Sequence, residues 1–306
     1  MTAYSSVLII DVLGSSRFET SPDIEAIEAQ MKLETEVPQP IIDLLETFKN
    51  VSDRNLAEAY HDAATARDEA MSLFGLGYMS LHMRAASEQL FFSIAAKLLD
   101  RAKRKGELPE EFESLPELLS DIYFCNFSLF QSMPDSWAID QLFPIAPIHR
   151  LNERPARLGI LADITCDSDG KIDHFVDKRI DKKTLELHEL KDLPGEGQGV
   201  EPYYLGVFLL GAYQEILGDL HNLLGDTHAV HLTIDDAGHW SIDEVIEGDT
   251  VEEVLQYVQY DIPDMKRSMR LDIEAACKQG RLTVGEGKSL LKYFDDGLEG
   301  YTYLEG

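Results

Sequence analysis

The chain has 306 residues, 44% of them hydrophobic, which is enough to bury the cores of two or three modest domains. Its 56 acidic residues outnumber 27 basic ones and give a formal net charge of −29. This charge repels phosphate backbones and anionic lipids, and it therefore argues against binding to nucleic acid or to a membrane surface. A cationic substrate would meet a favourable field, although the same acidity equally serves solubility.

The three cysteines, Cys125, Cys166 and Cys277, are widely spaced and form neither a CxxC pair nor a metal-finger pattern. We expect them to be reduced thiols. No apolar run approaches the ~20 residues that span a bilayer, and the N-terminus lacks the pattern of a signal peptide. The composition therefore predicts a cytoplasmic protein.

The first half of the chain changes from β to helical character. Residues 4–13 are rich in Val, Ile and Leu and predict a buried strand that ends at Gly14. After a polar segment with three prolines, residues 41–105 carry apolar side chains at spacings of three and four, which predicts a small helical bundle. Gly75 and Gly77 predict an interruption within it.

A glutamate-rich connection at 107–116, interpreted as solvated rather than functional, precedes a return of β-character. Short apolar or aromatic stretches bounded by Pro, Gly and Asp predict four strands. They span 123–130, 158–165, 204–209 and 229–234. Residues 235–238 (DDAG) predict a hairpin turn, with alternating apolar residues on the two strands that it joins.

Capping boxes at 250–253 (TVEE) and 283–286 (TVGE) predict two C-terminal helices, because a hydroxyl and a carboxylate there satisfy free amide donors reciprocally. The expected fold class is α+β: a mostly antiparallel β-barrel or sandwich with a helical-bundle insertion and C-terminal helices. The expected domains are a discontinuous β-domain, a helical insertion and a C-terminal helical domain. Their bounds are 1–20 with 120–248, then 38–119, and then 249–306.

Two strings, 163–170 (DITCDSDG) and 206–215 (GVFLLGAYQE), resemble the C-terminal half of the biosynthetic arginine decarboxylases. Four further stretches share the resemblance, and such long strings are more specific than a lone short motif. They are 7–14, 126–144, 221–226 and 300–304. The family implies conversion of arginine to agmatine and carbon dioxide with pyridoxal phosphate, in polyamine and spermidine biosynthesis.

In this family a (β/α)8 barrel comes first and holds the Schiff-base lysine, most of the phosphate loop and the acid that pairs with the pyridine nitrogen. The resemblance implies that this barrel is absent here, so the chain is expected to be a natural split half, a processed product or a truncated polypeptide. We therefore expect negligible catalysis by the chain alone, since no other side chain replaces that lysine at a prepared site.

The resemblance gives Cys166 the role of protonating the substrate Cα, from a position that reaches into the site of another subunit. A thiol is mostly protonated at neutral pH and can donate. Asp167 and Asp169 would face the distal end of the substrate, because carboxylates accept the planar fork of a guanidinium, or one of them would lie at the subunit boundary. The alternative is a plain polar turn, and the accompanying family strings weigh against it.

By the same resemblance, the Tyr213 hydroxyl would bind the cofactor phosphate; the alternative is a core tyrosine with a local partner. The polar groups of 221–226 (HNLLGD) either line the site or cap a helix. His228 and His231 predict a structural pair, since positions three apart in a strand face opposite sides. Magnesium is implied by the resemblance only, because no carboxylate spacing specifies a site.

The leading prediction is thus the C-terminal portion of a biosynthetic arginine decarboxylase, with arginine as substrate and with a barrel domain or a second decarboxylase subunit as partner in a homo- or hetero-oligomer. One alternative is a non-catalytic partner that regulates full-length decarboxylase subunits through the shared interface. A second alternative is a related decarboxylase that acts on another basic or dicarboxylic amino acid.

Overall fold

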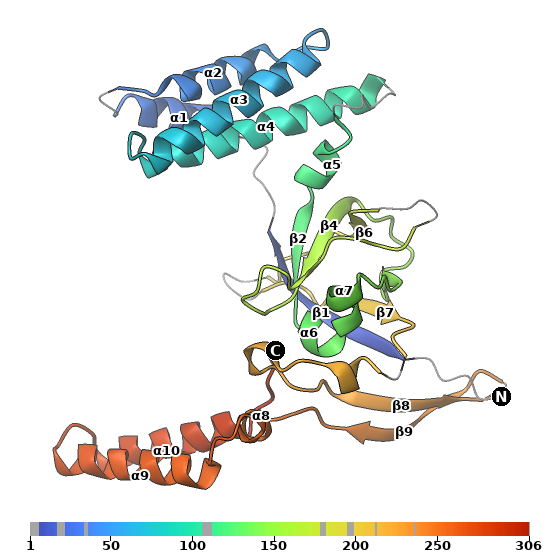
Figure 1. Cartoon of the computed structure of the whole chain (residues 1–306), viewed down its shortest axis with the longest axis vertical. Coiled ribbons are helices and arrows are strands. Elements are labelled where there is room, and N and C mark those ends of the chain that lie inside the picture. Colours follow the sequence, from blue (N-terminus) through green and yellow to red (C-terminus); the bar gives the residue numbers. More distant parts are fainter. Residues whose placement is uncertain are drawn as a thin grey trace.

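The computed structural model describes residues 6–16, 22–33, 36–105, 112–177, 182–194, 199–211, 213–235 and 237–305. The start of the predicted first strand, residues 106–111 and Asp236 of the predicted turn lie outside these ranges. Figure 1 shows a helical bundle at one end of the longest axis, a curled sheet in the centre, and a hairpin with the C-terminal helices at the other end. No helix in the described ranges is long and apolar enough to cross a membrane.

The bundle comprises α1 (Ile24–Met31), α2 (Gln39–Asn50), α3 (Leu56–Gly75) and α4 (Leu81–Lys105). Ala59, Ala63 and Ala66 recur every three or four residues along α3 and share a core with Leu90 and Leu98 of α4. Their small side chains permit close helix approach. The predicted helical character is confirmed, with the break where two glycines predicted it.

Helix α1 was missed by the sequence patterns, which marked its segment only as polar. Asp23 caps it by accepting a hydrogen bond from the Ala26 N–H at 2.9 Å, and Ile27 is buried against the other helices. A single apolar turn with an aspartate cap is too short to stand out as a periodic pattern. Helix α1 belongs to the bundle, where it packs against α4.

Seven strands form one sheet in the order β3-β7-β1-β2-β4-β5, with β6 also paired to β4. They are β1 (Val7–Ser16), β2 (Asp121–Cys125), β3 (Ile145–Pro147), β4 (Arg157–Ala162), β5 (Lys171–Ile172), β6 (Leu185–Leu187) and β7 (Tyr204–Phe208). Every pair is antiparallel except β2–β4. The α+β class and the mostly antiparallel sheet are confirmed.

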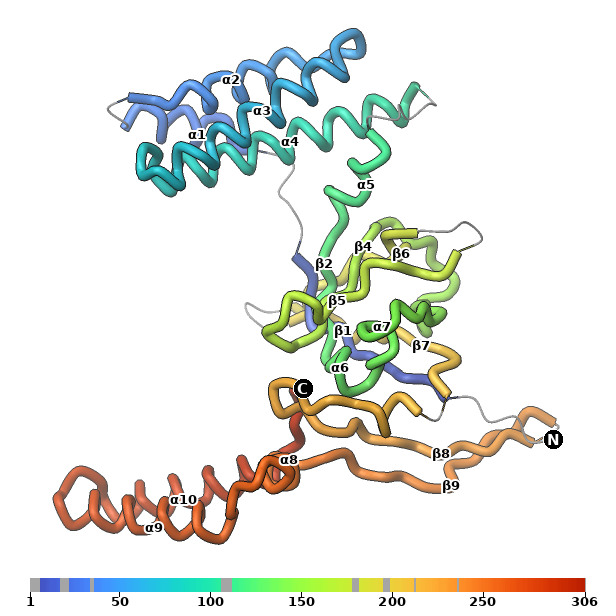
Figure 2. The backbone as a smooth tube through the Cα atoms, viewed as in Figure 1, coloured from blue at the N-terminus to red at the C-terminus, as the bar shows by residue number. Residues whose placement is uncertain are grey.

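The sheet curls because the two halves of β1 pair with different strands. Residues Val7 to Asp11 pair with β7, whereas Val12 to Ser16 pair with β2, and the register shifts between Val12 and Gly14. Such an irregularity bends a strand and increases its twist. The expected barrel or sandwich is therefore a single curled sheet, with β1 running through its middle as the tube in Figure 2 shows.

Two predicted strands are too long. β2 ends at Cys125, and the apolar residues after it form the short helix α6 (Leu129–Ser132), followed by α7 (Pro134–Ile139). Ser128 starts α6, because its side chain accepts a hydrogen bond from the Gln131 N–H. Aromatic composition alone favours a strand here, and the capping contact overrides it. Likewise β4 ends at Ala162, before the predicted 165.

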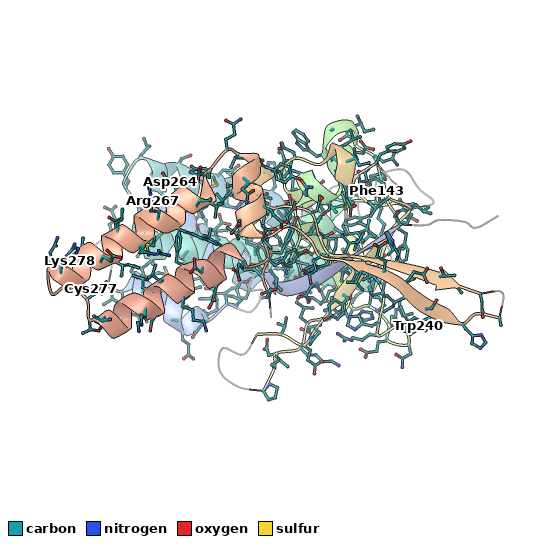
Figure 3. The ribbon with its side chains drawn as sticks, turned by 90° about the horizontal axis from the view of Figure 1, so that it is seen from below. Phe143, Trp240, Asp264, Arg267, Cys277 and Lys278 are labelled. Carbon is teal, nitrogen blue, oxygen red and sulfur yellow. The ribbon has the colours of Figure 1, made fainter. Side chains whose placement is uncertain are left out.

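The predicted hairpin is confirmed as β8 (Ala229–Ile234) and β9 (Trp240–Ile246), with Leu232 opposite Ile242 and Ile234 opposite Trp240. The C-terminal helices are α8 (Val251–Tyr257), α9 (Ile262–Lys278) and α10 (Val284–Leu298), and both predicted capping boxes are present. Figure 3 shows the hairpin and the α9–α10 pair extending in opposite directions. The chain also has short helical turns at α5 (Leu115–Leu118), η2 (Glu215–Leu217) and η3 (His221–Leu223).

The chain end returns to the sheet after α10, as Figure 2 shows. The Asn126 side chain, directly after β2, donates to the Leu304 carbonyl at 2.7 Å and accepts from the Leu304 N–H at 3.1 Å. The buried Tyr303 hydroxyl donates to the Gly225 carbonyl at 2.7 Å. These contacts join the C-terminal helices to the segment that carries η3.

Candidate functional site

A loop of residues 163–170 connects β4 to β5 and carries three of the predicted site residues. Asp163 anchors it, with only 6% of its surface exposed. Its carboxylate accepts hydrogen bonds from the Leu129 N–H at 2.8 Å and from the Thr165 N–H and hydroxyl at 2.9 and 2.7 Å. Burial raises the pKa of Asp163, and these donors oppose the rise. The loop is therefore fastened to the start of α6.

The second half of the loop is a tight turn. The Asp167 carboxylate accepts the Asp169 N–H at 2.9 Å, and the Gly170 N–H donates to the Asp167 carbonyl at 3.1 Å. A Cβ at Gly170 would collide with the Asp163 carboxylate and the Thr165 hydroxyl, so only glycine fits. The polar-turn interpretation thus describes the backbone correctly, and the turn leaves Asp169 exposed on its outside.

Cys166 is exposed at the top of this loop, and it meets Asn222 of η3. The Cys166 N–H donates to the Asn222 side-chain oxygen at 3.1 Å, and the Asn222 side-chain nitrogen donates to the Cys166 sulfur at 3.3 Å. Residues 56 positions apart in the sequence are therefore held together by one amide group. Within the 221–226 string, Asn222 therefore contacts the loop that carries the predicted site residues.

His221, next to Asn222 in η3, lies near the same loop. Its ring packs on Phe130 with centroids 4.5 Å apart, and Phe130 in turn meets the edge of Trp137 at 5.2 Å. The His221 Nε2 atom is 3.7 Å from a carboxylate oxygen of Asp167. This nitrogen is buried and has no hydrogen-bond partner within the described ranges. His221 and Asn222 thus contact two adjacent predicted site residues.

Tyr213 lies five residues after Phe208, where β7 ends, whereas the sequence predicted this strand to reach Leu209. Its side chain is 71% exposed, so the alternative of a core tyrosine is wrong. Gly211 beside it has a φ of +76°, and nothing lies within 4 Å of where a Cβ would stand. Within the described ranges, no hydrogen bond or ion pair joins Tyr213 to the 163–170 loop.

The other cysteines and histidines considered from the sequence lie away from the loop in sequence and have their own local surroundings. Cys125 is fully buried, and burial raises the pKa of its thiol, which makes it unreactive. Cys277 lies near the end of α9, within the α9–α10 pair that extends away from the hairpin (Figure 3). His228 stacks on Tyr301 with centroids 4.1 Å apart, and His231 pairs with Glu244 at 3.1 Å.

No metal centre is evident in the part of the chain that the structure describes. No group of three or more His, Cys, Asp or Glu side chains there could hold an ion. His228 and His231 turn to different partners, in agreement with the predicted structural pair. Met133 is buried, whereas Trp137, which meets the Phe130 ring, is 48% exposed.

Two family descriptions match the helical parts of the chain. Residues 34–116 match the arginine decarboxylase helical bundle domain, and residues 251–304 match the arginine decarboxylase C-terminal helical extension. The first includes α2, α3 and α4, and the second includes α8, α9 and α10. The helical parts on both sides of the sheet therefore define the class: a polypeptide built with arginine decarboxylase domains.

Whole-chain comparisons agree. The biosynthetic arginine decarboxylase of Phocaeicola vulgatus is 48% identical over 100% of this chain and 46% of its own length. That of Gloeobacter violaceus is 46% identical over 99% of this chain and 46% of its own length. The chain belongs to the biosynthetic arginine decarboxylase family, as the loop strings predicted, and it spans about half the length of the curated relatives it matches.

The fold agrees with a solved relative. The crystal structure of the biosynthetic arginine decarboxylase from Campylobacter jejuni matches with a TM-score of 0.79 and 31% identity, over 98% of this chain and 44% of that chain. The match covers the helical bundle, the curled sheet and the C-terminal helices together. The arrangement of the three parts is therefore shared with that enzyme.

Proposed function

We propose that this chain is the part of a biosynthetic arginine decarboxylase that completes the active site with Cys166, Asp167, Asp169 and Tyr213. The rest of that site, including the lysine that binds pyridoxal phosphate, would lie on a barrel domain or on a second decarboxylase subunit. The observation that carries the proposal is the exposed Cys166 thiol on a loop built to hold it, in a chain of this family. A buried thiol could not reach a substrate on another segment.

The residues on this chain suit a bound cofactor. The Tyr213 hydroxyl is exposed and has no hydrogen-bond partner within the described ranges, and a phenol O–H can donate to a phosphate oxygen. The open space at Gly211 allows a ligand to approach the backbone beside it. When bound, pyridoxal phosphate absorbs the electron density that departing carbon dioxide leaves on Cα.

Cys166 then supplies a proton. The bond between Cα and the carboxylate carbon breaks, carbon dioxide leaves, and the electron pair from that bond takes up the proton of the Cys166 thiol at Cα. The product of this exchange from arginine is agmatine. A thiolate remains on Cys166 and takes up a proton from solvent before the next turnover.

Asp167 and Asp169 would bind the guanidinium of arginine. The Asp169 carboxylate accepts no hydrogen bond from the described residues, and Asp167 keeps one oxygen outside the turn, towards His221. Two carboxylates near one cation suit a guanidinium, whose planar fork of donors pairs with them in charge-assisted hydrogen bonds. The formal charge of −29 adds a favourable field for such a cation.

A complementation assay tests the proposal. The chain is mixed with a polypeptide that carries the barrel half of a family member, and release of carbon dioxide from arginine is measured with pyridoxal phosphate present. We expect activity in the mixture and negligible activity from the chain alone. The Cys166→Ala variant should lower kcat by about 10²-fold or more, because general-acid catalysis contributes that much.

The matched control is Cys277→Ala, which removes a thiol on α9 and should leave the activity unchanged. A folded mixture without decarboxylation would contradict the proposal. An equal loss of activity in Cys166→Ala and Cys277→Ala would also contradict the proposal, because the loss would then not depend on the loop that carries Cys166.

A further inference from the structure

We propose that Asn222 is the positioning residue for Cys166: its side-chain amide holds both the backbone and the sulfur of the cysteine. The inference deepens the proposed function and rests on it for its catalytic meaning. Asn222 belongs to the 221–226 string, whose role the sequence left open, and it lies 56 positions from Cys166.

The orientation of the amide follows from the donor that it meets. A backbone N–H can only donate, so the Asn222 oxygen faces the Cys166 nitrogen, at 3.1 Å. The NH₂ group therefore faces the sulfur, at 3.3 Å. One planar group thus fixes the backbone at Cys166 and the direction of its side chain together, which a single contact could not do.

The backbone at η3 supports this arrangement. Asn222 and Leu223 both have a φ of +58°, the left-handed region that L-residues enter at a cost. Asparagine and aspartate tolerate this conformation better than most residues with a side chain, and of these two only asparagine brings an amide. Backbone strain of this kind is kept where the surroundings impose it, often at functional sites.

The contact also has a consequence for the thiol proton. Because the sulfur accepts a hydrogen bond from Asn222, its own hydrogen is free to point away from Asn222 and towards a substrate outside the loop. The adjacent residue lies near the next loop residue, since the His221 Nε2 atom is 3.7 Å from a carboxylate oxygen of Asp167. The dipeptide 221–222 therefore contacts the proposed proton donor and lies beside a proposed arginine ligand.

Two substitutions separate the contacts. Asn222→Gly removes the amide and tolerates the left-handed backbone, so the fold is retained. Asn222→Asp keeps an oxygen for the Cys166 N–H but places a carboxylate against the sulfur in place of a donor. Both are made in this chain, and its three thiols provide an internal comparison: Cys166 in the loop, Cys277 on α9 and the buried Cys125.

The first readout is hydrogen exchange of the Cys166 amide together with the alkylation rate of each thiol at about neutral pH. We expect exchange at Cys166 to quicken about fivefold in Asn222→Gly and to stay unchanged in Asn222→Asp, which retains the acceptor. Alkylation of Cys166 should slow about tenfold in Asn222→Asp, because an adjacent carboxylate opposes the thiolate. Cys277 should react at the parent rate in both variants.

The second readout is decarboxylation in the complemented enzyme. Asn222→Gly should lower kcat about tenfold and leave KM for arginine within about twofold, because a misplaced proton donor acts after the substrate is bound. The inference is overturned if Asn222→Gly leaves exchange at Cys166 unchanged, or if Cys277 changes by the same factor. If the parent mixture releases no carbon dioxide, the proposed function fails, whereas exchange and alkylation still decide whether Asn222 positions Cys166.

Discussion

Single residues hold the candidate site together through contacts that cross long stretches of sequence. Asp163 accepts one hydrogen bond from Leu129 of α6 and two from Thr165 within the loop, and Asn222 ties the same loop to η3 with two contacts. The Cys166 sulfur and the Asn222 amide are exposed, whereas Asp163, which anchors the loop, is buried. A rigid support beneath an exposed thiol favours a defined direction for proton transfer.

Asp163→Asn tests the anchor. An amide has one acceptor oxygen in place of two, so at least one of the three donors loses its partner, and the variant should lose about 1–3 kcal/mol of unfolding free energy. Burial raises the pKa of Asp163, so the folded state holds this proton more tightly than the unfolded state does. The stability that Asp163 contributes is therefore present below its unfolded pKa and is lost as the pH rises through its folded pKa.

The measurement is urea unfolding of the parent and of Asp163→Asn at about pH 4 and about pH 7. The deficit of the variant should be larger at the lower pH. A deficit that grows towards neutral pH would contradict the assignment of burial as the main cause of the shift.

At the scale of elements, capping hydrogen bonds at the first residues decide where helices begin. Both C-terminal capping boxes have the full reciprocal arrangement: the Thr283 hydroxyl accepts from the Glu286 N–H, and the Glu286 carboxylate accepts from the Thr283 N–H at 2.8 Å. Thr250 and Glu253 do the same for α8. The helices α9 and α10 are largely exposed, so such local contacts carry much of their stability.

Thr283→Ala should destabilise α10 by about 1 kcal/mol, since it removes the capping side chain. Hydrogen exchange should quicken in the first turns of α10 and stay unchanged in β1 and β7. Thr283→Ser, which keeps a hydroxyl, is the matched control and should remain close to the parent. Uniform exchange across the whole chain in Thr283→Ala would show that the box acts on more than its own helix.

At the scale of the whole molecule, β1, β2 and the chain end together connect the three parts. The β1 strand begins the sheet, the bundle follows it, and β2 returns the chain to the sheet (Figure 1). Asn126, just after β2, then binds Leu304 in both directions. The C-terminal helices are therefore fastened beside the segment that carries the candidate site.

Asn126→Ala should release this fastening. Two hydrogen bonds to Leu304 are lost, and amide exchange in residues 300–305 should quicken about tenfold, whereas α2, α3 and α4 stay at the parent rate. Mass-spectrometric hydrogen exchange measures both regions in one experiment. Unchanged exchange at the chain end would mean that Tyr303 and its contact with Gly225 suffice to hold it.

Much of the fold follows from local sequence. Apolar spacing predicted the bundle, two glycines its break, and the capping boxes α8 and α10, because each of these signals lies within a few residues of the element that it governs. Helix α1 and the helical turn at Leu129–Ser132 were missed. The first has little apolar pattern, and the second depends on caps from Ser128 and from the distant Asp163.

The sequence by itself determined the family, the α+β class, and Cys166, Asp167, Asp169 and Tyr213 as the residues to test. Only the tertiary structure decided that β1 joins both halves of a curled sheet and that Asn222 holds Cys166. The physical reason is range: periodicity, caps and turn residues act over a few positions, whereas the contact between residues 166 and 222 exists only after the sheet brings two loops together.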